Sequence, residues 1–267
     1  MLSTLDFSII ILFLAGISAY GIYNSRFNKT SEDYFLAGRD MPWWAAMLSI
    51  VATETSVLTF ISIPGLAYRD NWFFLQLALG YILGRILVSM FLLPAYFKGG
   101  ITSIYEVLGE RFGKKIQKTA SGVFLLTRIL ADGIRFLATA VIVQVVTGWS
   151  LPVAVLVIGA VTVVYTLMGG IRTVVWVDSF QFVLYLGGGL VAVFYILMHS
   201  DASFGSMLAQ LNDQGKLDIT RWGWDLFSNP WLFFSAVFGG MLLSFASHGA
   251  DYMMVQRVLS VRDLAGA

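Results

Sequence analysis

The stretch that decides the fold runs from Ser49 to Gly65 and reads SIVATETSVLTFISIPG. It is mainly apolar but carries four consecutive polar residues, Thr53 to Ser56, near its middle. Consecutive residues point all round a regular helix, so a membrane helix here would turn some polar side chains toward lipid. A local unwinding avoids this cost and frees carbonyl and hydroxyl oxygens to surround a small hard cation.

The alternative for this stretch is a helix–helix contact rich in Thr and Ser, with hydroxyls bonded back to the helix. We favour ion or solute binding because Glu54 has no evident place in such a contact. The stretch therefore predicts a broken membrane helix with a site at the break.

The composition of the whole chain agrees with a membrane environment. Of 267 residues, 58% are hydrophobic and 12% are charged, with a mean hydropathy of +0.78. Soluble domains carry about 25% charged residues. The net charge of +1 gives no electrostatic case for nucleic acid. The absence of cysteine and the presence of only two histidines exclude disulfides and argue against a zinc site.

A bilayer-spanning helix needs about 20 mainly apolar residues. Seven stretches qualify, and we expect a leading helix followed by helices one to six: 5–24, 42–68, 71–97, 118–147, 150–168, 173–199 and 229–258. The fold class predicted is an all-α membrane protein. Between helices two and three, Thr102 or Ser103 can cap a short amphipathic surface helix, with Glu106 at capping-box spacing from Ser103.

The Lys and Arg residues between these stretches predict the orientation. Three lie on one side, Arg69, Lys216 and Arg221. Eleven lie on the other: Arg26, Lys29, Arg39, Lys98, Arg111, Lys114, Lys115, Lys118, Arg172, Arg257 and Arg262. We expect a multi-pass protein of the plasma (bacterial inner) membrane. Its N-terminus would lie outside, and loop 98–117 and the C-terminus would be cytoplasmic.

Helix three carries Arg128, Asp132 and Arg135 at spacings that place them on one face. Asp132 can pair with either arginine, which leaves one positive charge in surplus. An arginine can bind a carboxylate through two parallel hydrogen bonds, so the surplus favours a carboxylate-bearing solute. The alternative is a buried structural triad.

Two further helices carry polar residues inside apolar stretches. Asp178, near the start of helix five, is either a group facing water or a cation ligand. Helix six has Gly239 and Gly240, then Ser244 and His248, and this cluster predicts a second break halfway along the helix. We expect Ser244 and His248 to contact the solute there. His248 and Asp251 could form a proton relay or a packed polar pair. An intramembrane enzyme would need more than this pair offers, so we expect no enzyme activity.

Five motifs in order resemble the sodium/solute symporter family, which includes sodium–glucose, sodium–proline and sodium–sialic acid cotransporters. They are EDYFLAGR at 32–39, ATETS at 52–56, TSIYEVLGERF at 102–112, MGGIRTVVWVD at 168–178 and DYMMVQR at 251–257. The resemblance implies a leucine-transporter-type inverted-repeat fold behind an extra leading helix. Residues 42–199 would then form the first five-helix repeat, and 229–258 the first helix of the second, within one transmembrane domain over 1–267.

The resemblance also implies site residues. The carbonyls of Ala52 and Thr55 would help to bind sodium, and Ser56 and Thr59 would face the solute. Glu54 and Asp178 occupy positions where some members carry acids that serve sodium. Ala131 stands where sialic acid carriers place a carboxylate-binding arginine, which disfavours sialic acid as the solute.

The family's principal sodium site also needs hydroxyls from the eighth core helix, so we expect this chain to be an incomplete, truncated carrier. The function predicted is sodium-coupled symport of a small organic solute by alternating access, with Na⁺ as coupling ion and no other cofactor. Proton coupling through Glu54, Asp132 or Asp178 is an alternative. A different alternative is a transporter-like input domain of a membrane sensor.

Overall fold

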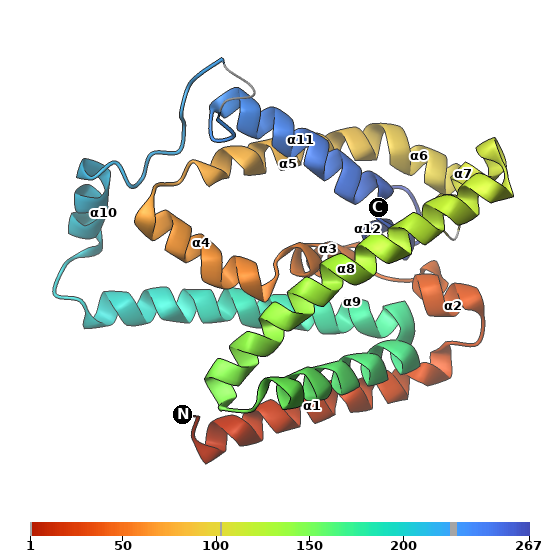
Figure 1. The fold of residues 1–267 in the computed structure, drawn as a ribbon, viewed down its shortest axis with the longest axis horizontal. Coiled ribbons are helices and arrows are strands. Elements are labelled where there is room, and N and C mark those ends of the chain that lie inside the picture. Colours follow the sequence, from red (N-terminus) through yellow and green to blue (C-terminus); the bar gives the residue numbers. More distant parts are fainter. Residues whose placement is uncertain (1, 102, 225–228) are drawn as a thin grey trace. The chain divides into compact units, whose positions relative to one another are not determined.

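The computed structural model describes residues 2–101, 103–224 and 229–267, and these residues are almost entirely helical (Figure 1). Their long helices and short connections fit a chain whose backbone polar groups must be satisfied within each segment in lipid. They fall into two compact units. Unit one comprises Met1–Leu58, Gly99–Ser179 and Gln256–Ala267, and unit two comprises Thr59–Lys98 and Phe180–Val255.

The helices over the described residues follow the predicted stretches closely. They are α1 (Thr4–Asn24), α2 (Ser31–Leu36), α3 (Trp43–Glu54), α4 (Val57–Arg69), α5 (Phe74–Leu87), α6 (Leu93–Gly99), α7 (Ile104–Phe112), α8 (Lys114–Thr147), α9 (Leu151–His199), α10 (Phe204–Asp213), α11 (Phe233–Ala250) and α12 (Tyr252–Leu259). A π-helical turn, Val88–Leu92, joins α5 to α6.

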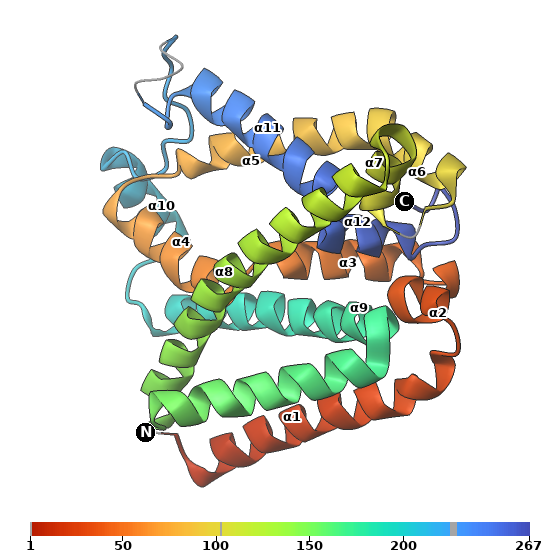
Figure 2. The ribbon, with the colours of Figure 1, turned by 45° about the vertical axis from the view of Figure 1, so that its right-hand side comes forward.

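Among the described residues, five helices are long and apolar enough to cross a membrane, or six if the bent pair α3–α4 is one span. The seventh predicted stretch is found inside α9. Gly170 has φ 61° and ψ −166°, which is not helical, and the chain turns back on itself there (Figure 2). The two predicted helices 150–168 and 173–199 are therefore the two arms of α9.

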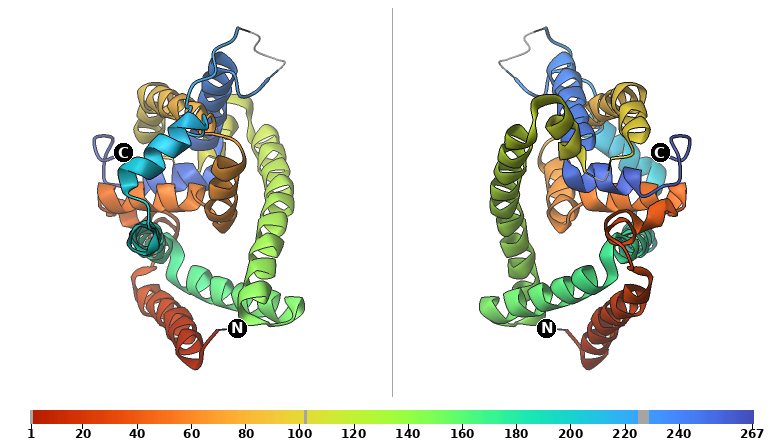
Figure 3. Two further views of the ribbon diagram at one scale, coloured as in Figure 1. Left: turned by 90° about the vertical axis from the view of Figure 1, so that its left-hand side faces the viewer. Right: turned by 90° about the vertical axis from the view of Figure 1, so that its right-hand side faces the viewer.

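The amphipathic helix predicted after helix two is confirmed as α7, whose N-cap is Ser103 with its hydroxyl accepting from the Tyr105 N–H. Thr102, the other predicted cap, lies outside the described residues. Gly113, with φ +87°, separates α7 from α8, and Figure 3 shows the long helix α8 in green at one side of the ribbon. The helix α10 was not predicted, because 204–213 lies in a polar connection and is too short for a span.

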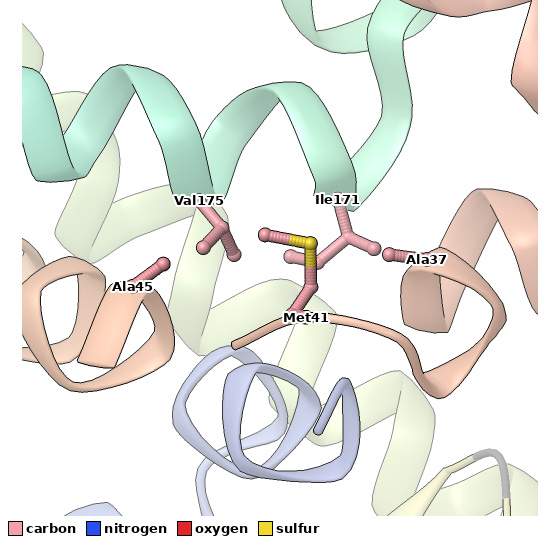
Figure 4. Packing of buried hydrophobic residues seen from close by; sticks show 5 residues of the cluster. All are labelled: Ala37, Met41, Ala45, Ile171 and Val175. Carbon is pink, nitrogen blue, oxygen red and sulfur yellow. The ribbon is translucent and has the colours of Figure 1, made fainter. Parts of the chain in front are cut away.

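The buried centre of unit one lies where the segment between α2 and α3 meets the second arm of α9. Ala37, Met41 and Ala45 pack there against Ile171 and Val175 (Figure 4). The same segment receives the end of the chain, since the Met41 N–H donates to the Ser260 carbonyl over 3.1 Å. This packing fixes the base of α3 relative to α9 and α12.

The leading helix α1 lies beside the first arm of α9 in unit one (Figures 1 and 2). Gly21 allows the approach, because a Cβ there would lie 2.7 Å from the Cα of Tyr165. At its end, the buried Asn24 amide donates to the Thr173 hydroxyl over 3.0 Å. A polar bond between helices in an apolar setting fixes their register.

Unit two is built on the pairing of α5 with α11, which lie side by side in both views (Figures 1 and 2). Glycines bring the two backbones together. A Cβ on Gly84 would lie 2.5 Å from the Met241 carbonyl oxygen, and one on Gly240 would lie 2.5 Å from the Leu77 carbonyl oxygen. Small residues permit such close approach in membrane proteins.

The predicted break halfway along helix six is wrong, since α11 is continuous from Phe233 to Ala250. The physical reason is that Gly240 serves helix packing rather than unwinding. The chain leaves the helical conformation only at Asp251, where ψ is 124°.

Candidate ion and solute site

The polar run in helix one is a true break in the helix. α3 ends at Glu54, α4 begins at Val57, and the pair is bent by 64°. Thr55 takes an extended conformation, with φ −90° and ψ 90°. A helix that ends at Glu54 leaves carbonyls of its last turn, which includes Ala52, outside the helical hydrogen-bond ladder. The predicted unwinding is confirmed, and it supplies the oxygen atoms that a hard cation prefers.

Thr53, within the polar run, makes the bond back to its own helix that the alternative of a Thr- and Ser-rich helix contact predicts. The Thr53 hydroxyl donates to the Ser49 carbonyl over 2.8 Å, which is an ordinary back-bond within the helix. The break thus lies at Thr55 and Ser56, and Thr53 belongs to the intact end of α3. Glu54 is the last helical residue before the break and brings a carboxylate next to it.

Asp178 lies at the centre of a polar cluster between α3 and the second arm of α9. Its Oδ2 accepts from the Ser49 hydroxyl at 2.7 Å and lies 3.4 Å from the Thr53 hydroxyl. The guanidinium of Arg257, on α12, donates from Nη2 to the same oxygen at 3.0 Å. Arg257 also donates from Nε to the Ser49 oxygen at 2.9 Å. Ser49 and the two charged groups therefore form a closed ring of hydrogen bonds.

This ring is buried. Only 5% of the Arg257 side chain and 16% of the Asp178 side chain are exposed, and Ser49 is fully covered. Arg257 lies on the helix α12 and is buried, so it is not the exposed loop cation that the sequence suggests. Its partner is 79 residues away in the sequence, so no local pattern identifies the pair. The clue available was that Arg257 ends a motif shared with the family.

The three charged residues of α8 form the predicted triad. Arg128 Nε lies 2.8 Å from Asp132 Oδ2, and Arg135 Nη1 lies 3.7 Å from Asp132 Oδ1. The side chain of Arg135 is 58% exposed and that of Arg128 is 21% exposed. Arg128 is therefore the structural partner of Asp132. Arg135 is held at ion-pair distance only, and its fork of donors can bind another anion.

In unit two, Ser244 and His248 are buried on successive turns of α11. The Ser244 hydroxyl donates to the Tyr81 carbonyl of α5 over 3.1 Å, and His248 Nδ1 lies 3.1 Å from the Ser247 hydroxyl. Asp251 accepts from the N–H groups of Met253 and Met254. This is the bonding of a helix N-cap, so Asp251 has a structural role at the start of α12.

The predicted site residues are thus divided between the units. Unit one holds Ala52, Glu54, Thr55, Ser56, Asp178 and the α8 triad, while unit two holds Thr59, Ser244 and His248. Sequence reasoning missed Ser49 and Arg257 altogether. A further pocket of about 190 Å³ in unit two contains none of the predicted residues, and its lining is Leu66, Asp70, Asn71, Phe73, Phe74, Arg221 and Trp231.

Comparison with known proteins places this geometry in context. A model of the sodium:solute symporter family matches residues 34–266. The sodium-coupled monocarboxylate transporter 1 of Xenopus laevis is 32% identical over 97% of this chain and 41% of its own length. The sodium/sialic acid symporter of Proteus mirabilis is 31% identical over 89% of this chain and 48% of its own length.

A solved structure agrees with the fold. It is the substrate-bound, outward-open state of a Na⁺-coupled sialic acid symporter, which matches with a TM-score of 0.89 and 28% identity over 99% of this chain and 55% of that chain. The leucine-transporter-type helical fold is therefore confirmed. This chain spans about half the length of the curated relatives it matches.

Proposed function

This chain belongs to the sodium:solute symporter family, and from that premise we propose that its protein takes up a small organic solute by sodium-coupled symport. The members named above are integral membrane carriers rather than enzymes, and none of them supports the alternative of a sensor input domain. In alternating access, Na⁺ binding would stabilise the outward-open state, so that the solute meets a preformed site. The chain would supply one repeat and the first helix of the next.

The observation that carries the proposal is the break between α3 and α4 at Thr55 and Ser56. An unwound segment inside an apolar span leaves carbonyl oxygens that only an ion, water or another polar group can satisfy. The carbonyls of Ala52 and Thr55 would take part in holding Na⁺. Glu54 would add negative charge beside the ion, and Asp178 would serve a second sodium position.

The solute in this proposal carries a carboxylate. Arg135 is the candidate partner because its guanidinium is only loosely held by Asp132, at 3.7 Å. Two relatives are named for monocarboxylates and for sialic acid, which are also acids. Ala131 in place of an arginine favours the smaller monocarboxylate. By the family resemblance, Ser56, Thr59, Ser244 and His248 would also contact the solute.

The orientation proposed places the N-terminus outside and loop 98–117 with the C-terminus in the cytoplasm. With Arg257 removed from the loop cations, ten Lys and Arg residues would still face the cytoplasm and three the outside. The positive-inside bias is therefore preserved.

The test is uptake of a labelled monocarboxylate by proteoliposomes containing the natural full-length protein. We expect inward Na⁺ gradients to drive accumulation and choline substitution to abolish it. Uptake that persists in choline without a proton gradient contradicts sodium coupling. Varying pH at fixed Na⁺ exposes proton coupling.

A matched pair of variants tests the break itself. Ser56→Ala should weaken Na⁺ or solute binding, whereas Ser62→Ala, at an exposed position of the following helix α4, should not. If Ser56→Ala and Ser62→Ala changed Na⁺ and solute binding equally, the break would have no part in binding.

A further inference from the structure

The buried Arg257–Asp178 pair has a consequence for ion binding that goes beyond the proposed function and rests on it. Oδ2 of Asp178 already accepts from Arg257 and from Ser49, at 3.0 and 2.7 Å. A cation on the side of the carboxylate that faces the hydroxyls of Ser49 and Thr53 would share that oxygen. The guanidinium thus occupies the cation position at this carboxylate.

A second cation cannot join without cost. Asp178 is an ion-pair partner of Arg257 at 3.0 Å, and the guanidinium balances the charge of this carboxylate. In a buried setting of low dielectric, two positive groups on the same oxygen repel each other strongly. Arginine cannot relieve this by losing its proton.

We infer that Arg257 is a built-in competitor of Na⁺ at Asp178, so that ion binding there requires the guanidinium to withdraw. An ion bound at Asp178 would therefore exclude the ion pair with Arg257. Arg257 acts through Asp178 as a positioning residue and touches neither solute nor ion in the bound state.

Movement of Arg257 would be detectable through the helix α12 that carries it. Arg257 lies on α12, which starts after Asp251 and is bonded to the rest of unit one by one side chain of the helix and by the backbone just after it. Gln256 donates to the Phe35 carbonyl over 2.7 Å, and Met41 binds the Ser260 carbonyl. Withdrawal of Arg257 from Asp178 must therefore disturb the seating of α12 on the segment between α2 and α3.

The test measures Na⁺ binding to the purified natural-length protein without solute, by the change in fluorescence of its tryptophans. Arg257→Gln removes the competitor, and we expect half-saturation at about tenfold lower Na⁺. Arg257→Lys keeps the charge and should stay near wild type. Adding Asp178→Asn to Arg257→Gln should abolish the gain. Arg262→Gln, which replaces an exposed arginine of the same unit, is the matched control and should change nothing.

Unchanged or weaker Na⁺ affinity in Arg257→Gln would overturn the inference while leaving the proposed function intact. If the wild type shows no Na⁺ response, the proposed function itself fails, and the competitor role with it. If Arg257→Gln fails to fold, amide hydrogen exchange of the wild-type protein tests whether Na⁺ displaces Arg257 from Asp178. Na⁺ should then speed exchange of the amides at 252–259 relative to choline, and identical exchange in both salts would contradict the competition.

Discussion

Arg128 Nε lies 2.8 Å from Asp132 Oδ2, one turn along the same face of α8, and this bond neutralises the carboxylate inside a long apolar helix. The contact has the i, i+4 spacing at which helical side chains meet. Because Arg128 already satisfies Asp132, the charge of Arg135 is the surplus of the triad. A helix rarely keeps such a surplus in a membrane span without a use for it.

Replacing Arg135 should therefore impair solute binding rather than folding. Hydrogen bonds to charged groups contribute about 1.5–3 kcal/mol, so Arg135→Ala should raise KM for a monocarboxylate by roughly ten- to a hundredfold. Lys118→Ala removes an exposed cation from the same helix and is the control. Uptake kinetics of both variants at saturating Na⁺ make the comparison. Equal KM values in the two variants would assign Arg135 to structure alone.

Asp178→Asn should lower stability in the absence of Na⁺, because it leaves the buried Arg257 without its counter-ion. Breaking a buried pair in this way costs about 3–5 kcal/mol. Glu32→Gln breaks the Arg39–Glu32 pair, in which the Glu32 side chain is 58% exposed, and should cost at most about 1 kcal/mol. Thermal unfolding in choline buffer measures the difference. Similar melting temperatures for the two variants would show that the buried ring adds no special stability.

Neighbouring glycines of α11 should respond in opposite directions to alanine. A Cβ on Gly240 would lie 2.5 Å from the Leu77 carbonyl oxygen, whereas one on Gly239 would meet nothing within 4 Å. Gly240→Ala should force α5 and α11 apart at a cost of about 1–3 kcal/mol. Gly239→Ala should be neutral or stabilise by up to about 1 kcal/mol through helix propensity. Melting temperatures in detergent test this, and a stable Gly240→Ala protein would argue against the close helix contact.

Gly170 should tolerate no side chain. Its φ of 61° with ψ of −166° is a conformation that only glycine adopts readily, and a Cβ would lie 2.8 Å from the Tyr34 carbonyl oxygen. Gly170→Ala should cost at least about 1–3 kcal/mol from backbone strain alone. Gly188→Ala, with open space around it in the same element α9, is the control. The yield of monodisperse protein and its melting temperature give the readout, and parity between the variants would refute the strained turn.

Hydropathy was enough to predict the spans, because each apolar stretch must bury its own backbone polar groups in lipid. The break at Thr55 and the turn at Gly170 were also predictable, since each has a local cause in four polar residues or a glycine pair. The surface helix α7 could be predicted from the cap at Ser103.

Features that depend on distant partners could not be predicted. Arg257 was assigned to a loop because the carboxylate that holds it is Asp178, on another helix. The glycines of α11 suggested a break because glycine serves both unwinding and close packing, and only the approach of Leu77 to Gly240 decides between them. The functions of the site residues stay predictions.

The reversal at Gly170 also bears on how the chain enters the bilayer. The two arms of α9 are joined by so short a turn that the translocation machinery has no polar loop at which to pause between them. Arg172, just past the turn, donates to the Ala37 carbonyl over 2.9 Å, and its charge holds that end at the membrane surface. We therefore expect the two arms to insert together as a helical hairpin during synthesis.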